Sequence, residues 1–134
     1  MSALEVGQVV AEKTYPLTRD SLVRYAGASG DFNPIHYRDD VAAEVGLPGV
    51  LAHGMLTMGI AVGIVSDALG DPGLMAECGV KFTRPVIVDA MTGADIHVRA
   101  EVGAIDDETA RVDLTVRFAD TSVLGKAQVR VRVS

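Results

Sequence analysis

Apolar and polar residues alternate one for one through the last third of the chain. Residues 92–104, 110–118 and 127–133 each place an apolar or small side chain at every second position. Successive side chains of a β-strand point to opposite faces, so this period of two predicts three strands with one buried face each. Turn-forming residues at 106–107 and 120–122 predict hairpins between them. The chain must therefore bury one face of an antiparallel sheet.

The element predicted to cover that face is a long helix. Residues 53–69 form a mostly apolar run that ends before Gly70, a typical helix stop. Apolar residues lie on all sides of this helix, which predicts that it is buried. Gly59 and Gly63 are four residues apart and allow close packing against the sheet. Residues 79–84 follow as a fourth candidate strand.

The first third of the chain adds one strand and two shorter helices. Residues 8–17 are strand-like, and Thr18 can cap a helix that stops near residues 27–30. A second short helix is predicted over residues 39–46. Together these elements predict a single α+β domain over residues 1–134, in which an antiparallel β-sheet wraps around the long central α-helix.

Composition excludes several classes of partner and cofactor. The twelve Lys and Arg residues are dispersed in a chain of net charge −6, so we expect no nucleic-acid partner. Cys78 is the one cysteine and no Cys/His cluster accompanies it, so no disulfide, metal or other cofactor is expected. The most apolar run, residues 55–65, is shorter than the roughly 20 residues that cross a bilayer. With no secretory signal at its start, the sequence predicts a cytoplasmic protein.

The segment from Tyr25 to His36, YAGASGDFNPIH, carries the strongest chemical signal. Pro34 prevents a continuous helix, so Asp31 and His36 lie five residues apart in a loop and can both face one small molecule. A carboxylate and an imidazole that share a water can act as an acid–base pair. Gly-Asp-x-Asn-Pro is also good turn chemistry, so spacing alone leaves a structural interpretation open.

Three blocks of sequence resemble one enzyme family. The string SGDFNPIH is similar to the signature of the (R)-specific enoyl-CoA hydratases, also called hydratase 2 or MaoC-like dehydratases. AHGMLT at residues 52–57 resembles the second block of that family, and KFTRPV at residues 81–86 resembles its third. The stretches EKTYPLTR, AHGMLTMG and GDPG also resemble the HadB-type subunits of (3R)-hydroxyacyl-ACP dehydratases.

The resemblance implies a hotdog fold, an acyl-CoA or acyl-ACP thioester as substrate, and a homodimer or a heterodimer with a second hotdog subunit. It assigns catalysis to Asp31 and His36 and the oxyanion-binding donor to the backbone N–H of Gly54. The first N–H groups of a helix are unpaired and partly positive, which suits the enolate that develops on a thioester. Asn33 and Ser29 are expected to support the pair.

The implied function is that of a hydro-lyase. It would remove water reversibly from (3R)-hydroxyacyl thioesters to give trans-2-enoyl thioesters in type II fatty acid synthesis, as a HadB-like subunit. A stand-alone (R)-specific enoyl-CoA hydratase is one alternative. A non-catalytic hotdog protein that binds acyl thioesters is another, although a binder has no use for the pair of Asp31 and His36. A thioesterase is a further rival, because fold does not fix function.

Four single residues carry narrower expectations. Arg38 stands where the family usually has Asp, Asn or Gln, so the cap of the following helix can shift by one residue. His53 is expected to start the long helix rather than to touch substrate. His97 alternates with apolar neighbours and is expected to face solvent, whereas the lone Cys78 is expected to be buried.

Overall fold

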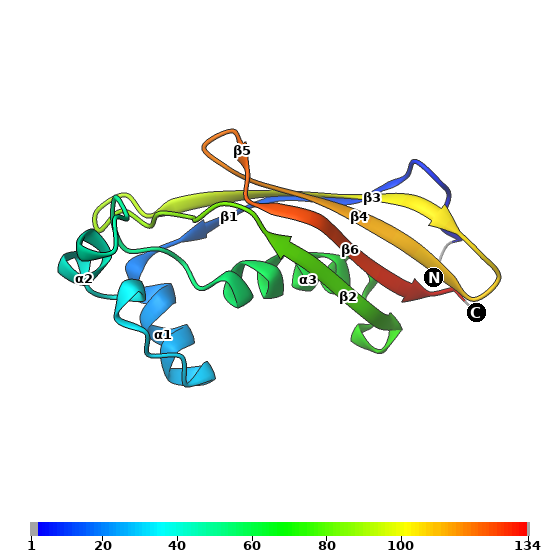
Figure 1. The fold of residues 1–134 in the computed structure, drawn as a ribbon. Coiled ribbons are helices and arrows are strands. Elements are labelled where there is room, and N and C mark those ends of the chain that lie inside the picture. The colour runs from blue at the N-terminus through cyan, green and yellow to red at the C-terminus, as the bar shows by residue number, and fades with distance from the viewer. Residues whose placement is uncertain (1–2, 134) are drawn as a thin grey trace.

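The protein forms one six-stranded antiparallel sheet with a long helix, α3, along one of its faces (Figure 1). The computed structural model describes residues 3–133. The strands follow the order β1-β3-β4-β6-β2, and the short β5 pairs with β4. This is the predicted α+β architecture. The strands are β1 Val9–Leu17, β2 Met75–Phe82, β3 Ala94–Ile105, β4 Thr109–Phe118, β5 Thr121–Ser122 and β6 Leu124–Arg132; the helices are α1 Arg19–Ser29, α2 Asp39–Glu44 and α3 Gly54–Leu69, with 3₁₀ turns η1 Pro34–His36 and η2 Pro72–Leu74.

The alternating pattern gave the correct faces of strands β3, β4 and β6. Alternate residues of each strand are buried, and the core among residues 3–133 contains only Val, Leu, Ile and Ala side chains. Burying such a side chain contributes roughly 1.5–3 kcal/mol. The pattern fails at Ala104, which is exposed because a register shift after Val102 interrupts the pairing of β3 with β4. The second hairpin turns at Ala119 and Asp120, one residue earlier than predicted.

Helix α1 begins and ends where the sequence predicted. The Thr18 hydroxyl accepts from the backbone N–H of Ser21, and the Ser21 hydroxyl accepts from the N–H of Thr18 in return. At the other end Gly30 has φ +78°, a left-handed conformation that glycine adopts without a Cβ penalty, and its N–H donates to the carbonyl of Ala26. The chain therefore turns sharply at Gly30, which is the second residue of the SGDFNPIH motif.

Helix α3 is less buried than its apolar composition predicted. Thr57, Ala61 and Val65 on one side face the sheet and are buried, whereas Met55 is 56% exposed and Gly59 is also exposed. Figure 1 shows the reason: the sheet covers one side of α3, and the opposite side is left open within a single chain. Within residues 3–133, no helix is long and apolar enough to cross a membrane.

The start of α2 differs from the expectation for Arg38. Arg38 itself occupies the N-cap and makes no side-chain cap bond, so the cap does not shift to Asp39. The guanidinium of Arg38 pairs with Asp40 instead, with 2.6 Å between Nη2 and Oδ2. Asp39 pairs with Arg19 of α1 at 2.9 Å. Two ion pairs therefore replace the predicted cap.

The expectation for Cys78 is wrong, and that for His97 is confirmed. Cys78 is exposed because it lies on β2, an edge strand whose one partner is β6. His97 lies on the outer face of β3, where Nε2 is 2.7 Å from the Glu12 carboxylate and Nδ1 is 3.0 Å from the Thr14 hydroxyl. An edge strand exposes residues that a sequence pattern alone assigns to a core.

Candidate active site

The SGDFNPIH motif folds into a turn that is held by its own side chains. Asn33 caps the 3₁₀ turn η1, because its side-chain oxygen accepts from the N–H of Ile35 at 3.2 Å. Pro34 takes the first position of that turn, where no N–H is needed. The motif is therefore both a good turn and the segment that carries the two candidate catalytic residues.

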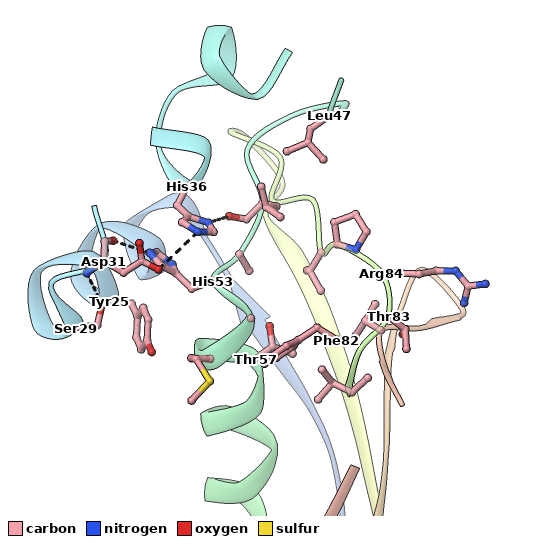
Figure 2. Close-up of a pocket in the computed structure, with 18 residues that line it drawn as sticks. Tyr25, Ser29, Asp31, His36, Leu47, His53, Thr57, Phe82, Thr83 and Arg84 are labelled. Atoms are coloured by element: carbon pink, nitrogen blue, oxygen red, sulfur yellow. Dashed lines mark hydrogen bonds and ion pairs between the residues drawn. The ribbon is translucent and has the colours of Figure 1, made fainter. Parts of the chain in front are cut away.

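Asp31 has one carboxylate oxygen bound and one free for other contacts. Oδ1 accepts from the backbone N–H of Asn33 at 3.2 Å, and the N–H of Asp31 donates to the Ser29 hydroxyl at 3.1 Å. Ser29 and Asn33 thus contact Asp31 directly, in the positions where the sequence predicted supporting residues. The second oxygen, Oδ2, points toward His36 (Figure 2).

His36 is oriented by the loop before α3. The residue is 8% exposed, and Nδ1 lies 2.7 Å from the backbone carbonyl of Leu51. A carbonyl only accepts, so Nδ1 carries the hydrogen and Nε2 is the bare nitrogen of the neutral ring. Nε2 lies 4.0 Å from Oδ2 of Asp31. The bound atoms of the pair face the protein, and the two free atoms face each other.

The N-terminus of α3 opens onto the same cavity. Gly54 is the first residue of this helix, and the side chain of the N-cap residue, His53, makes no hydrogen bond to the first turn. Asp31, His36 and Gly54 all line one cavity of about 730 Å³. The structure therefore brings together the three residues to which the sequence assigned the chemistry.

The wall of this cavity is largely apolar. Leu47, Met55, Val86 and Leu124 contribute to it, together with the ring of Phe82. Arg84 also lines the cavity, and Figure 2 shows its side chain pointing away from Asp31 and His36. A cavity with a few polar groups at one end and an apolar wall suits a ligand that has a polar head and an acyl chain.

His53 is the site residue whose contacts the sequence did not predict. It occupies the N-cap of α3, as expected, but its side chain is 1% exposed and stacks on His36 with 3.8 Å between ring centroids. Its Nε2 lies 3.1 Å from the carbonyl of Asp31. Burial lowers the pKa of the His53 imidazole below its ordinary value of 6.5. The one available signal was a histidine beside Gly54 in an otherwise apolar run.

Asp31, His36 and His53 also raise the question of a metal ion. Each brings one possible ligand atom within 4.8 Å of the other two, although the sequence predicted no metal site. The lone pairs of an imidazole lie in the plane of its ring, and these two rings are stacked 20° from parallel. Two nearly parallel stacked rings do not aim their lone pairs at one ion. The arrangement suits acid–base chemistry better than metal binding.

A meander of antiparallel strands packed on one long helix defines a hotdog domain, and Asp31 and His36 lie near the N-terminus of that helix. The family model of the MaoC-like domain matches residues 3–123 of this chain. The protein therefore belongs to the MaoC-like family.

Curated relatives carry the names of dehydratases. The 3-hydroxybutyryl-CoA dehydratase of Methylorubrum extorquens is 31% identical over 132 residues, which cover 96% of this chain and 81% of that protein. The 3-hydroxyacyl-thioester dehydratase X of Mycobacterium tuberculosis is 34% identical over 77 residues, which cover 58% of this chain and 26% of that protein. The chain thus spans about a quarter of the length of this second relative.

Solved structures share the fold over almost the whole chain. A MaoC-like dehydratase superimposes with a TM-score of 0.94 at 39% identity, covering 98% of this chain and 41% of that one. The HadBC dehydratase complex of Mycobacterium tuberculosis superimposes with a TM-score of 0.73 at 16% identity, covering 96% of each chain. At that identity the second likeness shows the fold alone.

Proposed function

We propose that this protein is a hydro-lyase that interconverts trans-2-enoyl thioesters and (3R)-hydroxyacyl thioesters. The observation that carries the proposal is the relation between Asp31 and His36. Each is fixed through one atom, and the remaining Oδ2 and Nε2 face each other across 4.0 Å at the polar end of the cavity. That separation is too long for a direct hydrogen bond and leaves both atoms able to contact one water.

In the hydration direction, the pair removes a proton from this water as its oxygen forms a bond to Cβ of the substrate. The π electrons between Cβ and Cα move toward the thioester carbonyl, and the resulting enolate collapses when Cα takes a proton from the pair on the same face. Dehydration is the reverse. Asp31 and His36 act as one acid–base unit, because their free atoms can both contact the same water.

The backbone N–H of Gly54 is the proposed donor to the thioester oxygen. It lies at the N-terminus of a 16-residue helix, where unpaired N–H groups and the helix dipole favour negative charge. The enolate carries that charge only during the reaction, so the interaction strengthens toward the transition state. Asn33 and Ser29 hold Asp31 through the hydrogen bonds described above.

Turnover of a short trans-2-enoyl-CoA by the purified chain tests this proposal. Loss of the conjugated-thioester absorbance, with a product of R configuration, supports the hydro-lyase, and Asp31→Asn and His36→Gln should each abolish the loss. Ligand binding without turnover, both alone and with a second hotdog subunit, would instead establish the non-catalytic binder. Release of free thiol without loss of the double bond would indicate a thioesterase.

We further propose a HadB-like role, in which the chain is the catalytic subunit of a two-subunit dehydratase acting on acyl carrier protein in type II fatty acid synthesis. The exposed flank of α3 and the open edge at β2 support a second hotdog subunit, because both leave surface that a partner can cover. The sequence likeness to HadB-type subunits favours a heterodimer, and the lone cysteine fits the cytoplasmic location that we also propose. A stand-alone (R)-specific enoyl-CoA hydratase is the alternative, as a homodimer.

Size-exclusion chromatography and carrier preference separate these two roles. A HadB-like subunit should gain activity and shift to a heterodimer when it is mixed with a second hotdog subunit, and it should prefer enoyl-ACP to enoyl-CoA. A homodimer with full activity on enoyl-CoA would establish the stand-alone hydratase. Fractionation of the source cells tests the cytoplasmic location.

A further inference from the structure

His53 contacts both members of the proposed catalytic pair. Its ring stacks on His36, with 3.8 Å between centroids and 20° between planes. Its Nε2 is 3.1 Å from the backbone carbonyl of Asp31, to which it donates. A helix-capping role does not account for these contacts, because the His53 side chain makes no hydrogen bond to the first turn of α3.

We propose that His53 is a positioning residue, a neutral imidazole that fixes the ring plane of His36 and the backbone of Asp31 so that their free atoms stay face to face. This inference rests on the proposed function, because it assigns His53 to the hydration reaction. His53 acts through its two neighbours and moves no proton itself.

The hydrogen-bonding geometry favours the neutral form of His53. The carbonyl of Asp31 can only accept, so Nε2 carries the hydrogen and Nδ1 is bare. Nδ1 is buried and has no hydrogen-bond partner within the described chain. A second proton would therefore stand at Nδ1 without an acceptor. Burial, followed by the neighbouring His36, lowers the pKa of His53 in the same direction.

The neutral state of His53 matters because of the groups that surround its imidazole ring. Tyr25 meets it edge-on at 4.7 Å between centroids, His36 covers one face, and Asp31 accepts at its edge. A positive charge on His53 would oppose protonation of the stacked His36. The neutral ring fixes His36 without opposing a proton that the pair of Asp31 and His36 holds during the reaction.

Three variants at this position separate the two contacts. His53→Phe keeps a flat ring for stacking and loses the donor, His53→Gln keeps a donor and loses the ring, and His53→Ala loses both. We expect kcat for a short trans-2-enoyl-CoA to fall about 10- to 100-fold in His53→Ala and by less in the other two, because small misplacements of reacting groups are costly. KM should stay within about threefold, since the residue holds the pair rather than the substrate.

His97→Gln is the matched control. His97 lies on the outer face of the sheet beside Glu12 and does not line the cavity, so its replacement should leave kcat unchanged. Melting temperatures of all variants report on folding. If His53→Ala does not fold, His53→Phe and His53→Gln still carry the comparison.

A second measurement does not depend on activity. The chain has three histidines, so ¹⁵N NMR of the imidazoles can be assigned with His53→Phe and His97→Gln. We expect His53 to show the neutral Nε2–H form at pH 7. The inference is overturned if kcat stays within about twofold of wild type in all folded variants, if KM alone rises, or if His53 is charged or carries its proton on Nδ1. A wild type that is inactive with and without a partner would sink the proposed function, while the NMR result would still report the state of His53.

Discussion

Phe82 lies so close to Gly54 that a Cβ on Gly54 would stand 2.9 Å from ring carbons Cδ1 and Cε1. The two residues come from different elements, β2 and the start of α3, and meet at the wall of the cavity that Asp31 and His36 also line. Gly54 is helical and has no positive φ, so the backbone itself accepts other residues there. The ring of Phe82 occupies the space that a side chain on Gly54 would need.

Gly54→Ala should therefore damage activity more than stability. The half-exposed ring of Phe82 can swing away from the new methyl group, and alanine favours a helix over glycine by about 1 kcal/mol. The methyl group would still obstruct the N–H that is proposed to bind the enolate. We expect an unchanged melting temperature and a fall in kcat of about 10- to 100-fold.

The double variant Gly54→Ala/Phe82→Ala identifies the cause of that loss. If the methyl group blocks the donor, removing the ring restores nothing, and this is the expected result. Recovery of activity in the double variant would show instead that displaced Phe82 obstructs the cavity, and it would remove the support for an oxyanion role of Gly54.

Replacing either Asp31 or His36, the proposed catalytic pair, should lower kcat by about 10²–10⁴-fold, the range for loss of an acid–base group. Asp31→Asn keeps an oxygen that can accept from the N–H of Asn33, so the turn should survive. Asp20→Asn is a suitable control, because Asp20 pairs with Arg24 on the exposed surface of α1. Steady-state kinetics and circular dichroism of Asp31→Asn, His36→Gln and Asp20→Asn check the prediction; equal activity of Asp31→Asn and Asp20→Asn would contradict it.

Arg19 ties α1 to the loop that orients His36. Its Nε donates to the carbonyl of Val88, its Nη atoms bind both oxygens of Asp39, and Asp39 accepts from the N–H of Val50. Arg19→Met should lower the melting temperature and speed amide hydrogen exchange at Val50 and Val88, since it leaves these loops less fixed. Arg24→Met, at a surface pair, should do neither. Unchanged amide hydrogen exchange in Arg19→Met would show that the loops keep their structure without the contacts of Arg19.

Acid should destabilise the fold below about pH 4, because it protonates carboxylates that accept hydrogen bonds in the folded state. The pKa of Asp39 is lowered below its ordinary 3.8 by the Arg19 hydrogen bonds, and the pKa of Asp89 by the N–H groups of Thr92 and Met91. A lowered pKa in the folded state contributes stability that is present above 3.8 and is lost as pH falls through the folded value. Melting temperatures between pH 7 and 3 measure this, and Asp89→Asn should show a smaller acid-induced decrease than wild type.

His53 should make the stability of the fold depend on pH in a second range, which lies above that of the carboxylates. Its pKa is lowered in the folded state by burial, so below its ordinary pKa of 6.5 the unfolded chain takes up a proton that the folded chain does not. Stability from this source is therefore present above 6.5 and decreases as pH falls below it. Urea unfolding at pH 7.5 and 5.5 should show that decrease in wild type and less of it in His53→Phe. An equal decrease in both proteins would mean that His53 is not the group responsible.

The sequence by itself determined the strands, the long helix and the turn that carries Asp31 and His36. Alternation in β3, β4 and β6 is a local property of the chain, because the faces of a strand follow from its own geometry. Thr18, Gly30 and Pro34 mark helix and turn boundaries through hydrogen bonds and φ angles within a few residues. The likeness to a family then favoured the catalytic over the structural interpretation of Asp31 and His36.

Tertiary structure decided the residues whose role depends on a distant partner. His53 lies 17 positions after His36 in the sequence and stacks on it only because the loop before α3 folds back on the motif. Phe82 reaches Gly54 from the end of β2, and Cys78 is exposed because β2 lies at the sheet edge. Periodicity records which side of an element is apolar, but it does not record what lies against that side. The open flank of α3, apolar yet uncovered, follows from the same limit.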